Sequence, residues 1–474
     1  MFQTFEVKAR PEQGPPRLAA LRVQMAAAGL DGFIVPRSDA HQGEYVAARD
    51  ARLAWLTGFT GSAGFCVALA EVAGVFIDGR YRTQVKAQVA DVYTPVHWPE
   101  VSLAAWLRQQ LPAGGRVGFD PWLHTVDQIA QAQKVLSGSG IDLVKTDNLV
   151  DAIWEDQPSP PMAPAKVHPL EFAGEPHEAK RARLAQTLVE TGARAALITL
   201  PDSICWLLNI RGADIERNPV VHGFAILHSD ATVDLFSEPS KFAGLAKHLG
   251  PEVRLRSPAL FLDAVAALAG PVRIDAATIP QIVADRLGDA AVHGTEPCAL
   301  PKACKNAAEI EGAAQAHLRD GAAMVEMLCW LDAQPAGSIT ETQVVTQLET
   351  LRRRDNGLQD ISFETIAGTG PNGAIMHYRV TEETDSLLED GHLLVLDSGG
   401  QYLDGTTDIT RTIAIGTPPR DACEAFTRVL AGMIAMSRLR WPAGLAGSHI
   451  EAVGRMPLWL AGQDFDHGLG HGVG

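Results

Sequence analysis

A long run of apolar residues at helical spacing is the clearest pattern in the chain. Between positions 306 and 332, apolar side chains recur every three or four residues and fall on one face, at Ile310, Ala314, Leu318, Val325 and Leu328. This spacing matches the 3.6 residues of a helical turn. We therefore predict one long amphipathic helix over 306–332.

Two earlier segments repeat the same order of patterns. Each starts with an Ala/Leu-rich helical stretch, at 18–29 and 183–192, followed by an apolar strand pattern, at 32–39 and 196–203. Each then reaches a turn that contains a tryptophan, at 52–62 and 203–213. Helix–strand alternation of this kind is typical of α/β domains with a parallel or mixed sheet.

Two breaks in the pattern suggest where the domains end. Five prolines fall within positions 158–169, which neither a helix nor a central strand can accommodate. A weaker break lies near 300–302, before the long helical pattern. We predict domains at 1–160, 161–305 and 306–474, the first two sharing a fold.

Composition and charge narrow the classes of function. The 474 residues carry a formal net charge of −16, so the surface repels nucleic acid and anionic lipid. An uninterrupted run of 18 apolar residues is missing, and the N-terminus does not resemble an export signal. The six scattered cysteines are expected to be small buried side chains in a reducing compartment.

Two aspartates interrupt apolar runs between positions 393 and 415. Asp397 and Asp408 lie 11 residues apart on either side of a short Gly-containing connection, which predicts a strand pair. Symmetric pairing about that connection would bring the two Cβ atoms to about 5 Å on one face. Carboxylates that close repel each other unless a cation lies between them, so we predict a divalent metal site. The alternative is two solvated aspartates at strand ends.

Three histidines lie in Gly-rich segments of the same region. His467 and His471 are four residues apart in a stretch too rich in glycine for a helix. Extended residues four apart stand about 13 Å apart, so one could bind a metal while the other reaches a substrate. His377 follows a permissive loop at 368–373. The alternatives are two polar loop histidines and, for His377, a packed histidine.

These residues and several further motifs resemble the aminopeptidase P group of the pita-bread metallopeptidases. The matching stretches are SFETIAGTGPNGAIMHY at 362–378, LDSGGQYLDGTTDITRT at 396–412, DHGLGHGVG at 466–474, VPRSDAHQGEY at 35–45, WLTGFTGSAG at 55–64, DGRY at 78–81 and WLLNIRGADIERNP at 206–219. The resemblance covers nearly the whole chain. It implies an α/β and α+β protein with two creatinase-like N-terminal domains before a pita-bread catalytic domain that is incomplete at its C-terminus.

The resemblance also implies an activity and the residues that carry it. The family releases the N-terminal residue from peptides with proline second, through a hydroxide that bridges two divalent metal ions. By this resemblance, Asp397 is a ligand of one ion, Asp408 bridges both, and His471 binds the second. His377 and His467 are the implied catalytic histidines, which also bind substrate, and Arg80 is an implied substrate-binding residue.

The implied ligand set includes two glutamates beyond the HGVG segment, whereas this sequence stops at Gly474. We therefore expect the 474-residue chain to lack the dinuclear centre and to represent part of a longer enzyme. Oxygen-rich ligands with one imidazole favour Mn²⁺ and leave Zn²⁺ and Co²⁺ open. We expect a cytoplasmic homodimer that binds peptides, and neither nucleic acid nor membrane. Two alternatives are a prolidase-type Xaa-Pro dipeptidase, whose usual form has one N-terminal domain, and a non-catalytic pita-bread binding protein.

Overall fold

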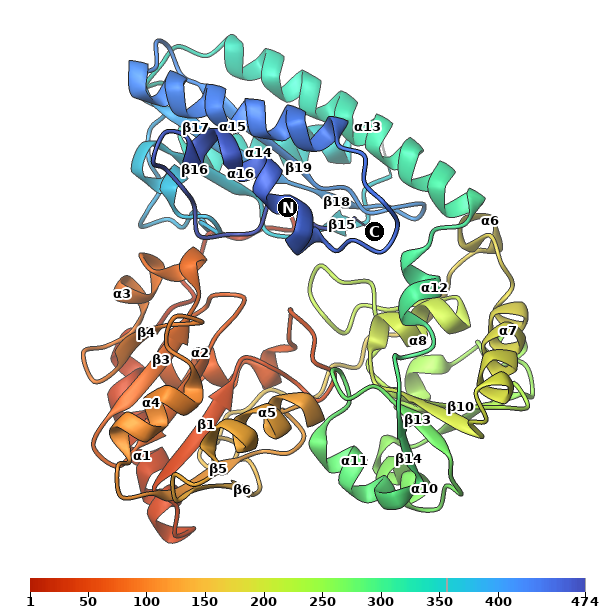
Figure 1. The fold of residues 1–474 in the computed structure, drawn as a ribbon. Coiled ribbons are helices and arrows are strands. Elements are labelled where there is room, and N and C mark those ends of the chain that lie inside the picture. Colours follow the sequence, from red (N-terminus) through yellow and green to blue (C-terminus); the bar gives the residue numbers. More distant parts are fainter. Residues whose placement is uncertain (355–356, 474) are drawn as a thin grey trace. The chain divides into compact units, whose positions relative to one another are not determined.

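The computed structural model describes residues 1–354 and 357–473, which form two compact units (Figure 1). We call Lys8–Ile77 with Gln84–Ala314 the N-terminal unit, and Met1–Val7, Asp78–Thr83 and Gln315–Gly474 the C-terminal unit. The boundaries near 160 and 305 stay a prediction. Within residues 1–354 and 357–473, no helix is long and apolar enough to cross a lipid bilayer.

The first sheet of the N-terminal unit has six strands. Their order is β4 (Thr94–His97), β3 (Ala73–Ile77), β2 (Phe65–Leu69), β1 (Gly32–Pro36), β5 (Gly115–Phe119) and β6 (Ile141–Lys145). β2 is antiparallel to both of its neighbours, whereas the other adjacent strands run parallel. The helices of this half are α1 (Gly14–Ala27), α2 (Arg52–Thr57), α3 (Gln84–Gln88), α4 (Leu103–Gln110) and α5 (Val126–Leu136).

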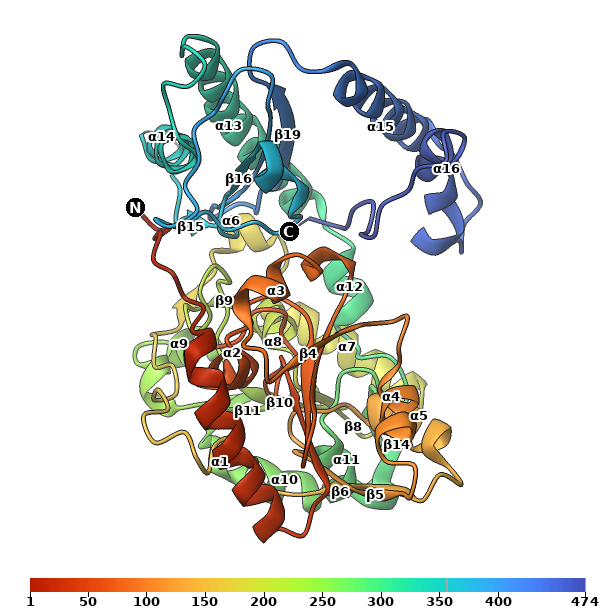
Figure 2. The same ribbon diagram turned by 90° about the vertical axis from the view of Figure 1, so that its left-hand side faces the viewer.

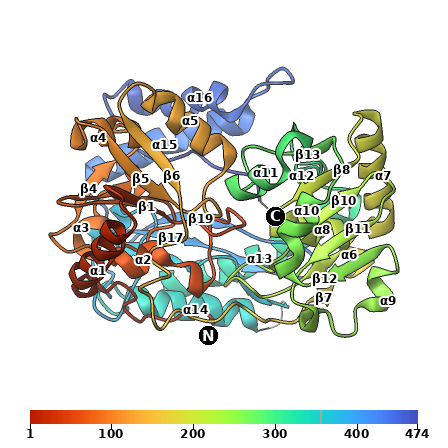
Figure 3. The same cartoon turned by 90° about the horizontal axis from the view of Figure 1, so that it is seen from below.

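The second sheet repeats that topology (Figure 3). Its order is β12 (Val253–Arg256), β11 (Val233–Phe236), β10 (Phe224–His228), β8 (Ala195–Ile198), β13 (Val272–Ile274) and β14 (Ala291–His293). β10 is antiparallel to both neighbours and the other pairs are parallel, as in the first sheet. The repeat seen in the sequence therefore corresponds to two sheets with the same strand order and the same strand directions.

The other elements of this half are mostly short. They are β7 (Lys166–Val167), which pairs with β9 (Ile210–Arg211), and the helices α6 (Leu170–Ala173), α7 (His177–Glu190), α8 (Pro201–Leu208), α9 (Ala246–Leu249), α10 (Phe261–Ala266), α11 (Gln281–Leu287) and α12 (Ala299–Ala303). The prediction of tryptophan-containing turns at 52–62 and 203–213 is wrong, because both segments begin with or continue a helix, α2 and α8. Both helices are short and bury their apolar residues. A short apolar run has too little periodicity to tell such a helix from a turn.

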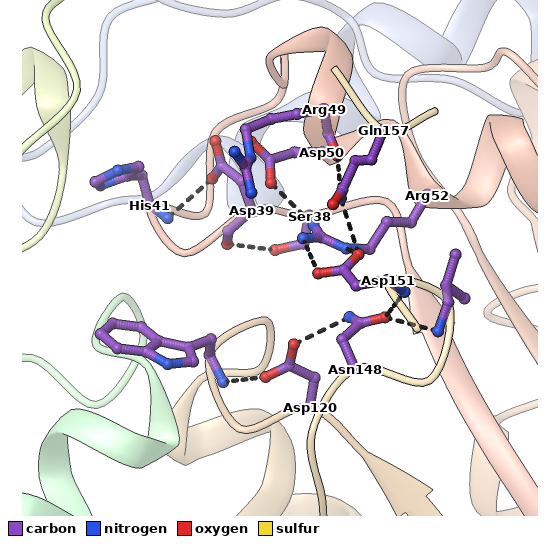
Figure 4. Close-up of polar contacts among 12 residues, drawn as sticks. Ser38, Asp39, His41, Arg49, Asp50, Arg52, Asp120, Asn148, Asp151 and Gln157 are labelled. Atoms are coloured by element: carbon purple, nitrogen blue, oxygen red, sulfur yellow. Dashed lines mark hydrogen bonds and ion pairs between the residues drawn. The ribbon is translucent and has the colours of Figure 1, made fainter. Parts of the chain in front are cut away.

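A buried arginine ties three loop segments of the first half together (Figure 4). Arg52 Nε and Nη2 donate to the two carboxylate oxygens of Asp151 at 2.6 and 2.9 Å, and Nη1 donates to Asp50 at 2.9 Å. Gln157 donates to the same Asp151 and to the carbonyl oxygen of Arg49. Burial raises the pKa of Asp50, and the charge of Arg52 opposes that rise. This ion-pair network fixes the loop that follows β1.

The C-terminal unit is built on a three-stranded antiparallel sheet. Its order is β16 (Ile366–Thr369), β17 (Leu393–Ser398) and β19 (Ile409–Ala414), with a small pair formed by β15 (Asp360–Ile361) and β18 (Gly400–Gln401). Its helices are α13 (Ala307–Asp332), which starts in the N-terminal unit, α14 (Glu341–Arg353), α15 (Arg420–Arg438) and α16 (Gly447–Trp459). An apolar core lies between α13, α14 and this sheet.

The long helix predicted over 306–332 is confirmed as α13, but its predicted apolar face is largely exposed. Ile310, Leu318 and Val325 are 58%, 68% and 58% exposed. The helix instead buries a neighbouring face that carries Asp320 and Met327. A polar residue at the centre of the buried face hides that face from a pattern of apolar positions alone.

The remaining helices, α15 and α16, pack against each other (Figure 2). A Cβ atom on Gly432 of α15 would lie 2.2 Å from the carbonyl oxygen of Gly454 of α16, so only glycine allows this approach.

The cysteines depart from the prediction of six buried side chains. Cys66, Cys205 and Cys298 are buried, whereas Cys304, Cys329 and Cys423 are exposed, and all six are free thiols.

Candidate active site

The predicted aspartates lie on and beside one hairpin of the C-terminal unit. Asp397 is in β17, opposite Thr410 of β19, and Asp408 precedes the first residue of β19. The predicted direct pairing of Asp397 with Asp408 is therefore wrong by two residues. The connection is not a symmetric turn, because Gly400–Gln401 leaves the hairpin and pairs with Asp360–Ile361. An even shift preserves the side to which a strand residue points, so the two aspartates still belong to one face.

Asp397 is a partly buried carboxylate beside a second carboxylate. Burial raises its pKa to about 6, and the negative charge of Asp408 acts in the same direction. The hydroxyl of Thr410, which donates to Asp397 Oδ1 at 2.7 Å, opposes the rise. A half-buried carboxylate beside a second one suits a bound cation.

His471 completes this group of three. Its Nε2 lies 3.2 Å from Oδ2 of Asp408, and the ring opposes the rise in the pKa of Asp397. The side chain of His471 is 71% exposed, and that of Asp408 is 25% exposed. Across residues 1–354 and 357–473, no three His, Cys, Asp or Glu side chains converge closely enough to form a finished metal site. Two carboxylates and one imidazole nonetheless fit part of a divalent metal centre by the chemistry of their donor atoms.

Arg80 lies in a tight turn, Gly79–Tyr81, that belongs to the C-terminal unit. Asp78 caps the turn by accepting a hydrogen bond from the backbone N–H of Arg80. The same carboxylate accepts from Arg80 Nε at 3.0 Å and from Nη2 at 2.7 Å. This two-pronged pairing fixes the plane and direction of the guanidinium.

The turn contacts the C-terminal segment that carries His467. A Cβ atom on Gly79 would lie 2.3 Å from Cβ of Asp466, so this approach requires glycine. Arg80 and His467 line one cavity of about 440 Å³, together with Asp78, Glu451, Arg455, Phe465, Asp466 and Gly468. The structure thus brings together two residues predicted to bind substrate, from positions 387 apart in the sequence.

Arg455 of α16 holds the backbone of this segment in place. It donates to the carbonyl oxygens of Phe465 and His467 at 2.7 and 2.9 Å, and to Asp464 at 2.8 Å. Its guanidinium also lies over the ring of Phe465, 4.1 Å from the centroid. A glycine-rich segment is thereby held by one cation from a neighbouring helix.

His377 is exposed on the loop after β16, and its ring contacts that of Tyr81. The Tyr81 hydroxyl lies 2.8 Å from Nδ1 of His377, and the two rings meet edge to face with centroids 5.7 Å apart.

A buried carboxylate supports the loop that leads to His377. Glu341, fully buried at the start of α14, accepts hydrogen bonds from the Thr369 N–H at 2.7 Å and the Tyr378 hydroxyl at 2.8 Å. It also accepts from the Asn372 side chain at 3.0 Å and the Ser386 N–H at 3.3 Å. Burial raises its pKa, and these donors oppose that rise.

The sequence interpretation missed four residues of this region: Asp78, Tyr81, Glu341 and Arg455. Two of them were visible as neighbours of Arg80 in the DGRY motif. The other two, Glu341 and Arg455, act through contacts with residues that a local sequence pattern does not reveal.

Comparisons with known proteins agree with these features. Residues 17–153 and 156–309 each match a model of the creatinase/prolidase N-terminal domain, and residues 311–474 match metallopeptidase family M24. The chain is 36% identical to a probable Xaa-Pro aminopeptidase P of Talaromyces marneffei, over 97% of this chain and 73% of the relative. It is also 36% identical to aminopeptidase P1 of Arabidopsis thaliana, over 96% of this chain and 80% of the relative.

Solved structures of aminopeptidases and prolidases also resemble this chain. The X-prolyl aminopeptidase of Caenorhabditis elegans, described as a cytosolic enzyme with a di-nuclear active site, aligns with a TM-score of 0.91 at 30% identity. That alignment covers 97% of this chain and 79% of the other. A prolidase of Pyrococcus horikoshii shares the fold over 62% of this chain and 82% of its own, with a TM-score of 0.51 at 21% identity. The predicted fold class, two creatinase-like domains before a metallopeptidase domain, is confirmed.

Proposed function

The chain belongs to the Xaa-Pro aminopeptidase P family of metallopeptidases, and on that premise we propose that it acts, with two divalent metal ions, on peptides that carry proline at the second position. The observation that carries this proposal is the group of Asp397, Asp408 and His471 on and beside the β17–β19 hairpin. Two ranges of the chain match N-terminal domain models, which favours an aminopeptidase over a prolidase with one N-terminal domain.

The metal side of the proposal rests on this hairpin. Asp397, Asp408 and His471 would hold the ions. Bound divalent ions supply a Lewis acid for the scissile carbonyl and a water of lowered pKa. The buried Asp397 carboxylate and its repulsion from Asp408 support this assignment, because a cation would relieve both.

The substrate side rests on the cavity and on His377. A bond that precedes proline has a nitrogen without a proton, so extended backbone pairing loses a donor and side chains must grip the peptide. Arg80, oriented by Asp78, and His467, held through Arg455, would bind the peptide. His377 would donate a hydrogen bond to the oxygen on which charge develops.

Three finer features belong to the same proposal. The oxygen-rich donor set favours Mn²⁺ as the metal, ahead of Zn²⁺ and Co²⁺. We also propose a homodimer in the cytoplasm. The description of the C. elegans relative as cytosolic supports the location, and size-exclusion chromatography with light scattering tests the dimer.

The activity is tested with the metal-loaded enzyme. It should release the first residue of a tripeptide with proline second, and a chelator should abolish that release. The same tripeptide with alanine second should resist cleavage, and an Xaa-Pro dipeptide should be a poor substrate. Equal cleavage of the proline and alanine peptides would contradict the proposed specificity, and preference for the dipeptide would favour a prolidase.

Two substitutions separate metal binding from chemistry. Asp408→Ala should remove metal binding measured by calorimetry, whereas Asp421→Ala, at an exposed position of α15, should leave it unchanged. His377→Ala should retain the metal and lower kcat by roughly 10²–10³-fold, the typical effect of one lost transition-state donor. The exposed His293→Ala serves as the matched control. An unchanged kcat in His377→Ala would remove that residue from the mechanism.

A further inference from the structure

Tyr81 is a buried residue that links two residues assigned to the substrate. It is 1% exposed, and it ends the same turn that presents Arg80. The guanidinium of Arg80 lies 5.1 Å from the centroid of its ring, and its hydroxyl lies 2.8 Å from Nδ1 of His377. A turn of three residues thus contacts a loop 296 residues away.

The chemistry of the two groups indicates the direction of this hydrogen bond. A phenol is a good donor and a weak acceptor, since its oxygen lone pair is delocalised into the ring. A neutral imidazole has one nitrogen that accepts and one that donates. Donation by Tyr81 to Nδ1 places the imidazole proton on Nε2. Nε2 is the other ring nitrogen, separated from Nδ1 by Cε1, and it points away from Tyr81.

We infer that Tyr81 is a positioning residue that holds His377 in the tautomer with its proton on Nε2, so that Nε2–H is the donor toward the reacting oxygen. The inference rests on the proposed function for the identity of that oxygen. The tautomer itself does not depend on activity. The edge-to-face contact between the two rings, inclined at 75°, holds the imidazole plane as the hydrogen bond holds its direction.

The turn that carries Tyr81 is itself firmly placed, which makes it a suitable support. Asp78 caps it, and the Tyr81 N–H donates to the carbonyl oxygen of Asp78 at 3.1 Å. Gly79 contacts Asp466 closely, and Arg82 pairs with the same Asp466 at 3.6 Å. The support for His377 is therefore anchored to the segment that carries His467.

The first test reads the tautomer directly. Nitrogen NMR of histidine-labelled protein, without metal, should show Nδ1 of His377 unprotonated and Nε2 protonated, with the signals assigned by their loss in His377→Ala. Tyr81→Phe, which keeps the ring and removes the hydroxyl, should add a population protonated at Nδ1. A wild-type ring protonated at Nδ1 would overturn the inference, whatever the enzyme cleaves.

The second test measures the consequence for catalysis in the metal-loaded enzyme. Tyr81→Phe should lower kcat by about tenfold, the value of one hydrogen bond, and change KM by less than about twofold. In a His377→Ala background the same change should alter kcat by less than about twofold, because Tyr81 acts through His377. Tyr93→Phe is the matched control, since Tyr93 is also buried and donates to the Leu56 carbonyl at 2.7 Å in the N-terminal unit. Equal losses from Tyr81→Phe with and without His377 would show a purely structural role and overturn the inference.

Discussion

Removal of Arg352 should destabilise the hairpin that carries Asp397. Arg352 of α14 and Asp320 of α13 form an ion pair with side chains 1% and 0% exposed. Nε and Nη2 donate to the two oxygens of Asp320 at 2.6 and 2.9 Å, and Nη2 also donates to Ser398 at 3.0 Å. The Tyr402 hydroxyl donates to the same Asp320 at 2.7 Å. This ion pair anchors both sides of the segment that follows Asp397.

The magnitude follows from what each substitution leaves behind. Arg352→Met keeps the length of the side chain and leaves a buried carboxylate unpaired, which costs about 3–5 kcal/mol. Adding Asp320→Asn removes that charge while keeping an acceptor for Tyr402. The double variant should therefore recover at least about 2 kcal/mol of the loss, because replacing a whole buried pair costs far less than breaking it.

The assay must resolve local stability, since the chain has two compact units. Hydrogen exchange followed by mass spectrometry on peptides that cover β17 and α14 gives the opening free energy of each segment. Arg354→Met is the matched control: Arg354, the residue directly after α14, pairs with Glu326 of α13 at 2.7 Å, but the side chains are 57% and 46% exposed. It should change the free energy by less than about 1 kcal/mol. Arg352→Met with native protection, or a double variant as unstable as the single one, would refute this reasoning.

Three further predictions concern other buried groups. Glu341→Gln should lower the local stability by about 2–4 kcal/mol, because a donating amide N–H₂ group replaces a carboxylate oxygen that accepts hydrogen bonds. Hydrogen exchange of residues 366–378 measures this loss, and the exposed Glu383→Gln is the control. Burial lowers the pKa of His124 to about 4, so the unfolded chain binds its proton first, and stability is lost as pH falls from about 6.5 to 4. His124→Asn should reduce the loss between pH 7 and pH 4.5 by about 2 kcal/mol in urea unfolding, and an identical pH dependence would contradict the assignment. Arg455→Met should lower kcat/KM by about tenfold through the backbone of His467, with the exposed Arg438→Met as control.

The elements predictable from the sequence are those governed by a local period. The long helix, the two copies of the α/β pattern and the strand pair around Asp397 were all visible as spacing of apolar residues. The apolar run at 65–77, which Glu71 interrupts, likewise forms two strands, β2 and β3. Each of these depends on residues within one turn or one strand of each other, which a pattern can record.

The features that could not be predicted depend on where a chain segment goes next. The predicted register of the hairpin was wrong by two residues because Gly400–Gln401 pairs with Asp360–Ile361, a partner about 40 residues away. The buried face of α13 was misjudged because Asp320 pairs with Arg352 and so behaves as a core residue. In both cases a distant partner decides the outcome.

The candidate site contains two sets of residues that are held in place by different neighbours. Substitutions of those neighbours should therefore have different effects. Asp397 depends on a hairpin anchored by Arg352, whereas His377 and His467 depend on Tyr81 and Arg455. Loosening the hairpin should weaken metal binding first. Loosening the Gly79–Tyr81 turn should slow the reaction more than it weakens metal binding, because the turn contacts His377 and the segment that carries His467. Arg352→Met and Tyr81→Phe, compared for metal affinity and for kcat, should thus show opposite orders of effect. If each variant lost metal affinity and kcat to the same extent, the hairpin and the turn would act as a single support, which would contradict this prediction.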